Sequence, residues 1–239
     1  MFALIRFPLM LAIYILAAIL PSILLMRYIY RQDRVEKEPM SLLMSLMFFG
    51  VVAAVLAGFW EPVADRLLGL FFSRTGHLYT VLFAFLVVAA TEESAKLLFL
   101  KWRTWGDRNF DCRFDGIVYA VFVSLGFAAY ENLLYVFRYG LSVALPRAVL
   151  SVPGHLAFAV VMGLFYGRAR LAQARGRERS VRRYLRWAWL LAVALHGFYD
   201  ACAMIGTPVA ITLFSAFVLI LYYAIYRLIR RESAQDRPF

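Results

Sequence analysis

The chain has 239 residues, of which 63% are hydrophobic, 17% aromatic and only 17% charged. Its mean hydropathy of +0.71 excludes an ordinary soluble globular protein and is typical of a polytopic membrane protein. A net charge of +11 would favour a nucleic-acid partner in a soluble domain. Here the basic residues flank apolar runs, where they orient membrane spans and contact anionic lipid. We therefore expect the lipid bilayer, and not nucleic acid, as a partner.

Seven apolar runs are long enough to cross roughly 30 Å of hydrocarbon as helices, so we expect one all-α transmembrane bundle over residues 1–239. The expected spans are 7–26, 40–60, 78–100, 116–137, 148–167, 187–205 and 209–226. The last two are separated by Gly206-Thr207-Pro208, which interrupts an apolar stretch too long for one crossing. Residues 61–76 mix arginines with leucine and phenylalanine, a pattern typical of an interfacial segment.

The distribution of basic residues predicts the orientation of the bundle. Of the 26 Lys and Arg residues, 20 lie in connections one, three and five and in the C-terminal tail. Only 5 lie at the N-terminus and in the other connections, and Lys96 lies inside the third span. Cytoplasmic loops carry the excess of positive charge, so we expect the N-terminus outside and the C-terminus in the cytoplasm.

The third span contains three ionisable residues, Glu92, Glu93 and Lys96. Charged side chains at bilayer depth cost roughly 2.5–3.5 kcal/mol on insertion scales, so they are rare unless they have partners or do chemistry. Lys96 lies three or four residues from either carboxylate and can neutralise only one of them. The other is free to exchange a proton as a general acid or base does. An interhelical salt bridge that fixes packing is the alternative.

Three further spans also carry polar groups at middle depth. Glu131 and Asn132 lie in the fourth span, His155 in the fifth, and His196 and Asp200 lie four residues apart on one face of the sixth. Each alone could serve helix packing. Together, two imidazoles and several carboxylates form a nitrogen and oxygen set suited to a divalent metal such as zinc. A glutamate beside a metal-bound water is the minimum apparatus for hydrolysis, although the histidines could instead contact an oxyanion directly.

Several motifs lie in order on separate helices. They are Asp33 through Glu38-Pro39, Glu92-Glu93-x-x-Lys96, Asp115-Gly116, Gly126-Phe127-x-x-x-Glu131-Asn132, His155 and His196-x-x-x-Asp200. With these motifs the chain resembles the PrsW-type intramembrane proteases, which are relatives of the CAAX prenyl endopeptidases. The CAAX relatives have histidine at the position of Glu131 and arginine one residue after that of Lys96, which points away from prenylated substrates.

The resemblance implies catalysis by Glu92, Glu93, His155 and His196, with Glu131 and Asp200 as metal ligands or orienting residues. We expect Lys96 to hold one carboxylate ionised, and Phe127 and Asn132 to support the site. The resemblance also implies a multi-pass protein of the bacterial cell membrane. Such a protein makes the first cut in a membrane-bound anti-sigma factor, which is a single-pass substrate.

Two other classes of function remain open. A proton-coupled transporter would also place Glu, His and Lys at the midplane, but such folds commonly have repeated halves, and none is evident in this sequence. A non-catalytic scaffold or receptor of the same fold would tolerate substitution of Glu92 and His196.

Overall fold

The structure is a computed structural model that describes residues 2–239, with side chains from residue 8, so Met1 lies outside it. In that part of the chain every regular secondary-structure element is a helix, apart from one isolated β-bridge between Cys112 and Pro238. In order, the elements are α1 (Phe2–Gln32), α2 (Met40–Phe71), α3 (His77–Leu82), η1 (Phe83–Ala89), α4 (Ala90–Thr104), α5 (Asp115–Tyr139), η2 (Leu141–Val143), α6 (Ala144–Pro146), η3 (Arg147–Ser151), α7 (Val152–Ala174), α8 (Glu178–Ile205) and α9 (Pro208–Ala234).

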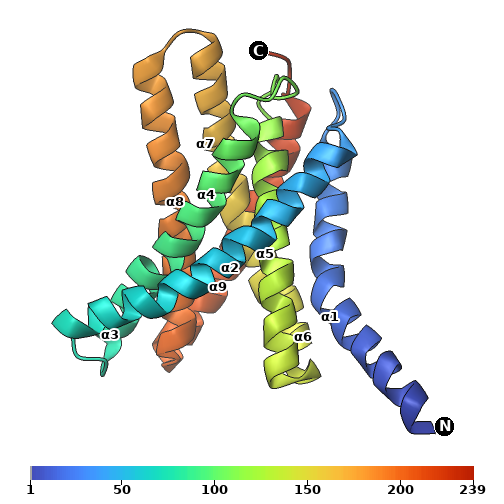
Figure 1. Cartoon of the computed structure of the whole chain (residues 1–239). Coiled ribbons are helices and arrows are strands. Elements are labelled where there is room, and N and C mark those ends of the chain that lie inside the picture. The colour runs from blue at the N-terminus through green and yellow to red at the C-terminus, as the bar shows by residue number, and fades with distance from the viewer. Residues whose placement is uncertain (1) are drawn as a thin grey trace.

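Within residues 2–239, six helical segments are long and apolar enough to cross a membrane. They are Pro8–Gln32, Met40–Phe71, Asp115–Tyr139, Leu141–Ala174, Glu178–Ile205 and Pro208–Ala234. The expected third span is not among the six. Its helical run is divided into α3, the π-helical η1 and α4, and α4 carries charged side chains. Helical structure nevertheless continues from His77 to Thr104. Figure 1 shows this run rising through the bundle and the chain termini at opposite ends, which confirms the expected all-α polytopic fold.

Several helices extend past the apolar runs that predicted them, and α2, α8 and α9 are clear examples. Helix α2 continues to Phe71, so most of the expected interfacial segment 61–76 is the end of this helix. Helix α8 begins at Glu178, which shortens the basic connection after α7 to residues 175–177, and α9 continues to Ala234. A helix needs only about 20 residues to cross the hydrocarbon, and its backbone hydrogen bonds form equally well between polar residues beyond it.

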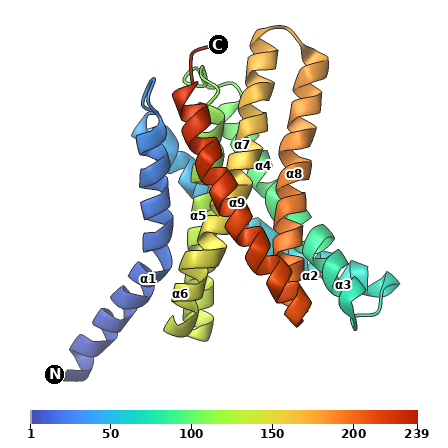
Figure 2. The ribbon, with the colours of Figure 1, turned by 180° about the vertical axis from the view of Figure 1, so that it is seen from behind.

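Helix α5 forms the core of the bundle. Its side chains from Asp115 to Ala128 are buried without interruption, as expected of a helix surrounded on all sides. Of its apolar window 72% is buried, against 17% for α1 and 22% for α9. Figure 2 shows α9 crossing the outside of the bundle, so α1 and α9 present most of their apolar surface to lipid.

Glycines bring α5 and α7 into close contact. A Cβ on Gly163 would lie 2.4 Å from the carbonyl oxygen of Gly116, and one on Gly116 would lie 2.6 Å from the backbone nitrogen of Gly167. Small residues of this kind let membrane helices pack backbone against backbone. The crossing packs α5, which carries Glu131, closely against α7, which carries His155.

Candidate active site

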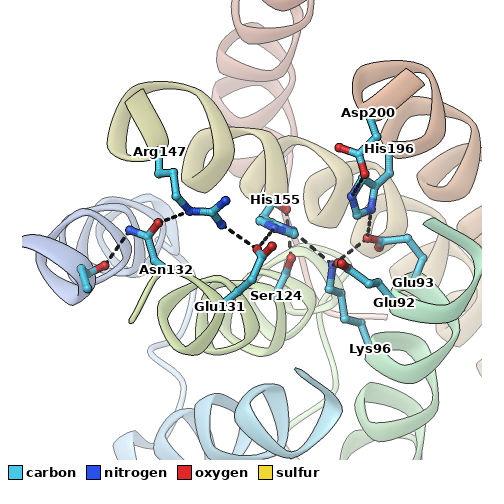
Figure 3. A network of polar contacts seen from close by, with 11 residues as sticks. Glu92, Glu93, Lys96, Ser124, Glu131, Asn132, Arg147, His155, His196 and Asp200 are labelled. Carbon is cyan, nitrogen blue, oxygen red and sulfur yellow. Dashed lines mark hydrogen bonds and ion pairs between the residues drawn. The ribbon is translucent and has the colours of Figure 1, made fainter. Parts of the chain in front are cut away.

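A chain of polar contacts runs through the interior of the bundle from α1 to α8 (Figure 3). It joins groups from helices that are far apart in the sequence and includes every polar residue that the sequence analysis assigned to the site. From one end to the other it contains Asn132, Arg147, Glu131, His155, Lys96, Glu92, Glu93, His196 and Asp200. The expectation that separate helices contribute to a single cluster therefore agrees with the geometry.

Lys96 lies at the centre of this network and is only 1% exposed. Its ammonium Nζ donates to Glu92 Oε2 at 3.0 Å and to Glu93 Oε1 at 2.7 Å. The same nitrogen lies 3.1 Å from His155 Nδ1, and the Phe127 ring centroid lies 4.1 Å away. The lysine thus contacts both carboxylates at once, and Phe127 supports it through a cation–π contact.

The contact with Lys96 fixes the tautomer of His155. An ammonium has hydrogens to donate and no lone pair to accept with, so Nδ1 must be the acceptor. A neutral ring then carries its hydrogen on Nε2, which lies 3.0 Å from Glu131 Oε2. His155 is therefore a hydrogen-bond donor on its Glu131 side. Ser124 Oγ adds a hydrogen bond to the His155 backbone carbonyl at 3.0 Å, which holds α7 against α5.

His196 lies between two carboxylates. Its Nδ1 is 2.9 Å from Glu93 Oε1, and its Nε2 is 3.4 Å from Asp200 Oδ2, one turn further along α8. Phe158 stacks on the ring with centroids 4.7 Å apart. Gly197 leaves room for a neighbouring side chain, because a Cβ on Gly197 would lie 2.5 Å from Cδ1 of Phe85.

A cavity of about 610 Å³ opens beside this network. Carboxyl and imidazole groups on its wall come from α2, α4, α5, α7 and α8: Glu61, Glu92, Glu131, His155, His196 and Asp200. Glu93 is fully buried and is not part of the wall. The two adjacent glutamates are therefore not equivalent, since Glu92 faces the cavity and Glu93 lies behind it.

The cavity lies toward the end of the bundle where α8 meets α9. Its wall includes Met204 in the last turn of α8, Ile211 in the first turn of α9, and Pro146 just before η3. That end also holds the N-terminus, opposite the C-terminus (Figure 1).

Two π-helical turns directly precede helices that carry residues of the polar network. One, η1, directly precedes the helix that carries Glu92 and Glu93, and the other, η3, leads into the helix that carries His155. A π-turn adds a residue to a helical turn and is frequent at functional sites, because it changes which side chains face inward. Pro153 lies in the first turn of α7 and has no amide hydrogen to donate to the preceding π-helical turn.

Asn132 anchors the far end of the network and lies away from the cavity. Its Nδ2 donates to the Ala18 carbonyl of α1 at 2.9 Å, and its Oδ1 accepts from Arg147 Nε at 2.6 Å. Arg147 NH2 also forms an ion pair with Glu131 Oε2 at 2.8 Å. Asn132 therefore supports the site indirectly, by holding the arginine that neutralises Glu131.

Sequence comparison identifies the family of the chain. The family described as PrsW family intramembrane metalloprotease matches residues 38–229. The chain belongs to this family. Protease PrsW of Geobacillus kaustophilus is 33% identical over 223 residues, covering 93% of each chain. The enzyme of Clostridioides difficile is 33% identical over 87% of this chain and 86% of its own, and that of Bacillus subtilis is 34% identical over 77% and 79%. No solved structure matches.

Membership of the PrsW family confirms the resemblance seen in the motifs. The chain is an intramembrane protease and a multi-pass protein of the bacterial membrane. The matched region includes every residue of the polar network except Ala18 of α1. Neither the individual catalytic roles nor the natural substrate follows from the family name.

The family description includes a metal, so the fit of the site to one is relevant. The ligand atoms of Glu92, Glu93 and His155 lie within 4.8 Å of one another, and their types suit a divalent metal. The Lys96 ammonium, however, contacts all three side chains and takes the position that a metal would need. As arranged, these donors fit the ammonium and not a metal, so the mechanism below uses none.

The four metal ligands expected from the sequence do not surround a single point. They form two separate pairs. Glu131 lies with His155, and Asp200 lies with His196, with the ring centroids of the two histidines 5.4 Å apart. With Nδ1 as the acceptor from Lys96, the Nε2 of a neutral His155 has no lone pair for a metal. These four residues as metal ligands stay a prediction.

Sequence reasoning missed two charged residues of the site. Arg147 falls between the expected spans 116–137 and 148–167, although it neutralises Glu131. Glu61 falls in the expected interfacial segment, although it lies on the cavity wall. A signal for Arg147 existed, because Glu131 has no basic residue three or four positions away within its span. No comparable signal marked Glu61.

Proposed function

We propose that this chain hydrolyses peptide bonds of single-pass membrane proteins and that Glu92 is the general base. The observation that carries the assignment is the burial of Glu93 behind the cavity wall, with Glu92 on the wall itself. A general base must come within hydrogen-bond reach of the water that it activates. Of the two glutamates, only Glu92 meets that requirement.

In the proposed reaction, the carboxylate of Glu92 takes a proton from a water molecule in the cavity. The water oxygen bonds to the carbonyl carbon of the scissile peptide, and the carbonyl oxygen becomes an oxyanion. When the carbon–nitrogen bond breaks, the amine receives the proton that Glu92 had taken. The products are a new carboxyl end and a new amino end, so no other reactant is needed.

The oxyanion requires hydrogen-bond donors that are fixed in advance. His155 carries its Nε2–H on the cavity wall, with its tautomer set by Lys96, and in the proposed reaction this hydrogen turns from Glu131 to the oxyanion. Arg147 also lies on the wall and carries a permanent positive charge. We propose that His155 and Arg147 together stabilise the oxyanion, while Glu93 orients His196 beside the leaving amine.

Cleavage of a single-pass substrate by the purified, reconstituted protein tests this assignment. Glu92→Gln should abolish cleavage and His196→Ala should reduce it severely, with both proteins present in the membrane near the wild-type amount. Glu36→Gln is a matched control, because Glu36 is exposed in the connection between α1 and α2. Full cleavage by Glu92→Gln would remove this residue from the mechanism and favour the scaffold alternative.

For the natural substrate, we propose an anti-sigma factor that crosses the membrane once. The support is the resemblance of the motifs, and the cavity is compatible with an extended peptide segment. Coexpression with candidate single-pass proteins of the same bacterium would test it, since the true substrate should lose its intact form only when Glu92 is present.

Zinc is the second candidate feature of the mechanism. The family description and the donor types of Glu92, Glu93 and His155 favour it, and the position of Lys96 argues against it. Metal analysis of the purified protein decides between them. Stoichiometric zinc that is lost in the combined His155→Ala/His196→Ala variant would overturn the metal-free mechanism.

A further inference from the structure

A second cluster of ionisable groups lies at the end of the bundle that holds the C-terminus. Asp33 directly follows α1, Asp115 begins α5, and Asp236 belongs to the tail after α9. One carboxylate oxygen of each lies within 4.8 Å of the other two. At 1.5 Å per residue, Asp115 is roughly 24 Å along α5 from Glu131, so the cluster is separate from the hydrolytic site.

The Asp33 carboxylate forms no ion pair with any of the described residues. Its side chain is 1% exposed, and neither carboxylate oxygen has a hydrogen-bond partner. The nearby Lys37 ammonium contacts the backbone carbonyls of Tyr30 and Asp33 and not the carboxylate. A buried polar group without a partner costs several kcal/mol at worst, and a buried charge more, so its environment calls for a compensating cation.

The other two carboxylates are held in place from behind by backbone amides. Asp115 Oδ2 accepts from the amides of Asp111 and Cys112 at 3.2 and 2.7 Å. Asp236 Oδ1 accepts from the amide of Phe114 at 3.0 Å, while its Oδ2 is buried without a partner in the described chain. Asp115 and Asp236 are thus oriented by backbone amides, and each keeps one carboxylate oxygen that these hydrogen bonds do not use.

We propose that Asp33, Asp115 and Asp236 bind one hard divalent cation, Mg²⁺ or Ca²⁺. Both ions take oxygen ligands, and carboxylates are their usual protein ligands. The cluster has no imidazole, so it lacks the nitrogen donor that favours zinc.

Such an ion would fasten the C-terminal tail to the connection between α1 and α2 and to the start of α5. The tail already lies against the connection before α5. Phe239 donates its amide to the Asp111 carbonyl at 2.9 Å, and Arg113 NH2 donates to the Gln235 carbonyl at 3.3 Å. These contacts bring Asp236 to the other two aspartates, and the cation supplies the charge that lets all three remain there.

Thermal unfolding of the purified full-length protein in detergent tests the proposal. After treatment with a chelator and its removal, addition of millimolar Mg²⁺ or Ca²⁺ should raise the unfolding temperature by several degrees, because a ligand that binds only the folded state stabilises it. Separate Mg²⁺ and Ca²⁺ titrations identify the preferred ion. Metal analysis should find one equivalent of that ion per chain.

Asp33→Asn and Asp236→Asn should each remove the cation response. Without cation they should unfold at or above the wild-type temperature, because they relieve repulsion among the carboxylates. Glu36→Gln should keep the full response, since it removes the same charge from an exposed position in the same connection. The combined Glu92→Gln/His196→Ala variant should also keep it, which separates this site from the hydrolytic one.

The proposal is overturned if the wild-type protein shows no shift with either ion, or if both Asp33→Asn and Asp236→Asn respond as the wild type does. It is equally overturned if acidification alone stabilises the protein while the ions do not, because the aspartates would then be sharing protons and not a metal.

Discussion

Glu93 Oε1 lies 2.9 Å from His196 Nδ1, and the glutamate side chain is completely buried. This carboxylate accepts the Nδ1 hydrogen and so leaves Nε2 of the ring facing Asp200 and the cavity. A carboxylate behind a histidine fixes both the tautomer and the orientation of the ring. In the proposed mechanism, the second glutamate of the pair is therefore a positioning residue that acts on catalysis through His196.

Glu93→Gln should lower kcat for cleavage by roughly 100-fold or more, with a small effect on KM. A loss of that size is typical when a general acid or base is no longer correctly placed. Because Glu93 acts through His196, its substitution should have little further effect in a His196→Ala background. Cleavage rates of the two single variants and the double variant measure this coupling. Additive losses would mean that Glu93 acts independently of the histidine.

Lys96→Ala should destabilise the fold as well as abolish activity. It leaves Glu92 and Glu93 buried without their cation, and loss of one partner of a buried ion pair typically costs about 3–5 kcal/mol. The unfolding temperature in detergent is the measurement. A Lys96→Ala/Glu93→Gln double variant should recover part of the loss, because it removes one of the stranded charges. If the single variant is as stable as the wild type, the ion pairs do not hold α4 in place.

The sequence alone predicted which helices bring polar groups together, because charged residues within apolar runs are exceptional. Glu92, Glu131, His155 and His196 all meet at the cavity as expected. Spacing along a helix could not decide which of Glu92 and Glu93 faces that cavity. The π-helical turn of η1 just before them shifts the register of the helix, and the sequence carries no clear sign of it.

Sequence patterns also could not predict which distant segments contact one another. Arg147 and Glu131 form an ion pair only because the chain turns back between the end of α5 and the start of η3. Hydropathy marks where the apolar part of a helix ends and not where its hydrogen bonding ends. For that reason α2 and α8 are longer than predicted, and Glu61, near the apolar boundary, is part of a helix that reaches the cavity.

The orientation of the bundle gives a prediction that is independent of the chemistry. Reporter fusions in the connection at residues 175–177 should report a cytoplasmic location, because basic residues are concentrated there and at the other connections of the same end. A fusion at residues 206–207, between α8 and α9, should report the opposite side. A periplasmic signal from residues 175–177 would invert the topology and every statement about depth.

The buried acid Glu38 predicts how stability changes with pH. Burial raises the pKa of this carboxyl from 4.5 to about 7, although Tyr119 donates a hydrogen bond to it. The folded state then holds a proton that the unfolded state releases, so stability should fall as pH rises from about 4.5 to 7. Unfolding temperatures measured in chelator across this range check it, and Glu38→Gln should flatten the curve.

Asp33 contributes in the same direction, because burial raises its pKa to about 6. The Glu38→Gln variant should therefore keep a shallower decline at the lower end of the range. A wild-type protein that gains stability over the same pH range would contradict the burial of both acids.

The position of the cavity predicts where a substrate is cut. Counted at 1.5 Å per residue from the end of the bundle that holds the N-terminus, Glu131 lies about 12 Å deep on α5, His196 about 14 Å on α8 and Glu92 about 22 Å along its helix. The cavity wall continues from these groups to Met204 and Ile211 at that same end. With the N-terminus outside, the cavity opens in the outer half of the bilayer.

We therefore predict cleavage at or just outside the outer edge of the substrate's transmembrane helix. A peptide bond becomes attackable only when the helix unwinds, and unwinding costs least near the surface, where water can satisfy the freed backbone groups. Mass spectrometry of products from a reconstituted single-pass substrate, with Glu92→Gln as the inactive control, locates the cut. A scissile bond in the cytoplasmic half would contradict the depth of the cavity or the orientation of the bundle, and reporter fusions would then distinguish the two.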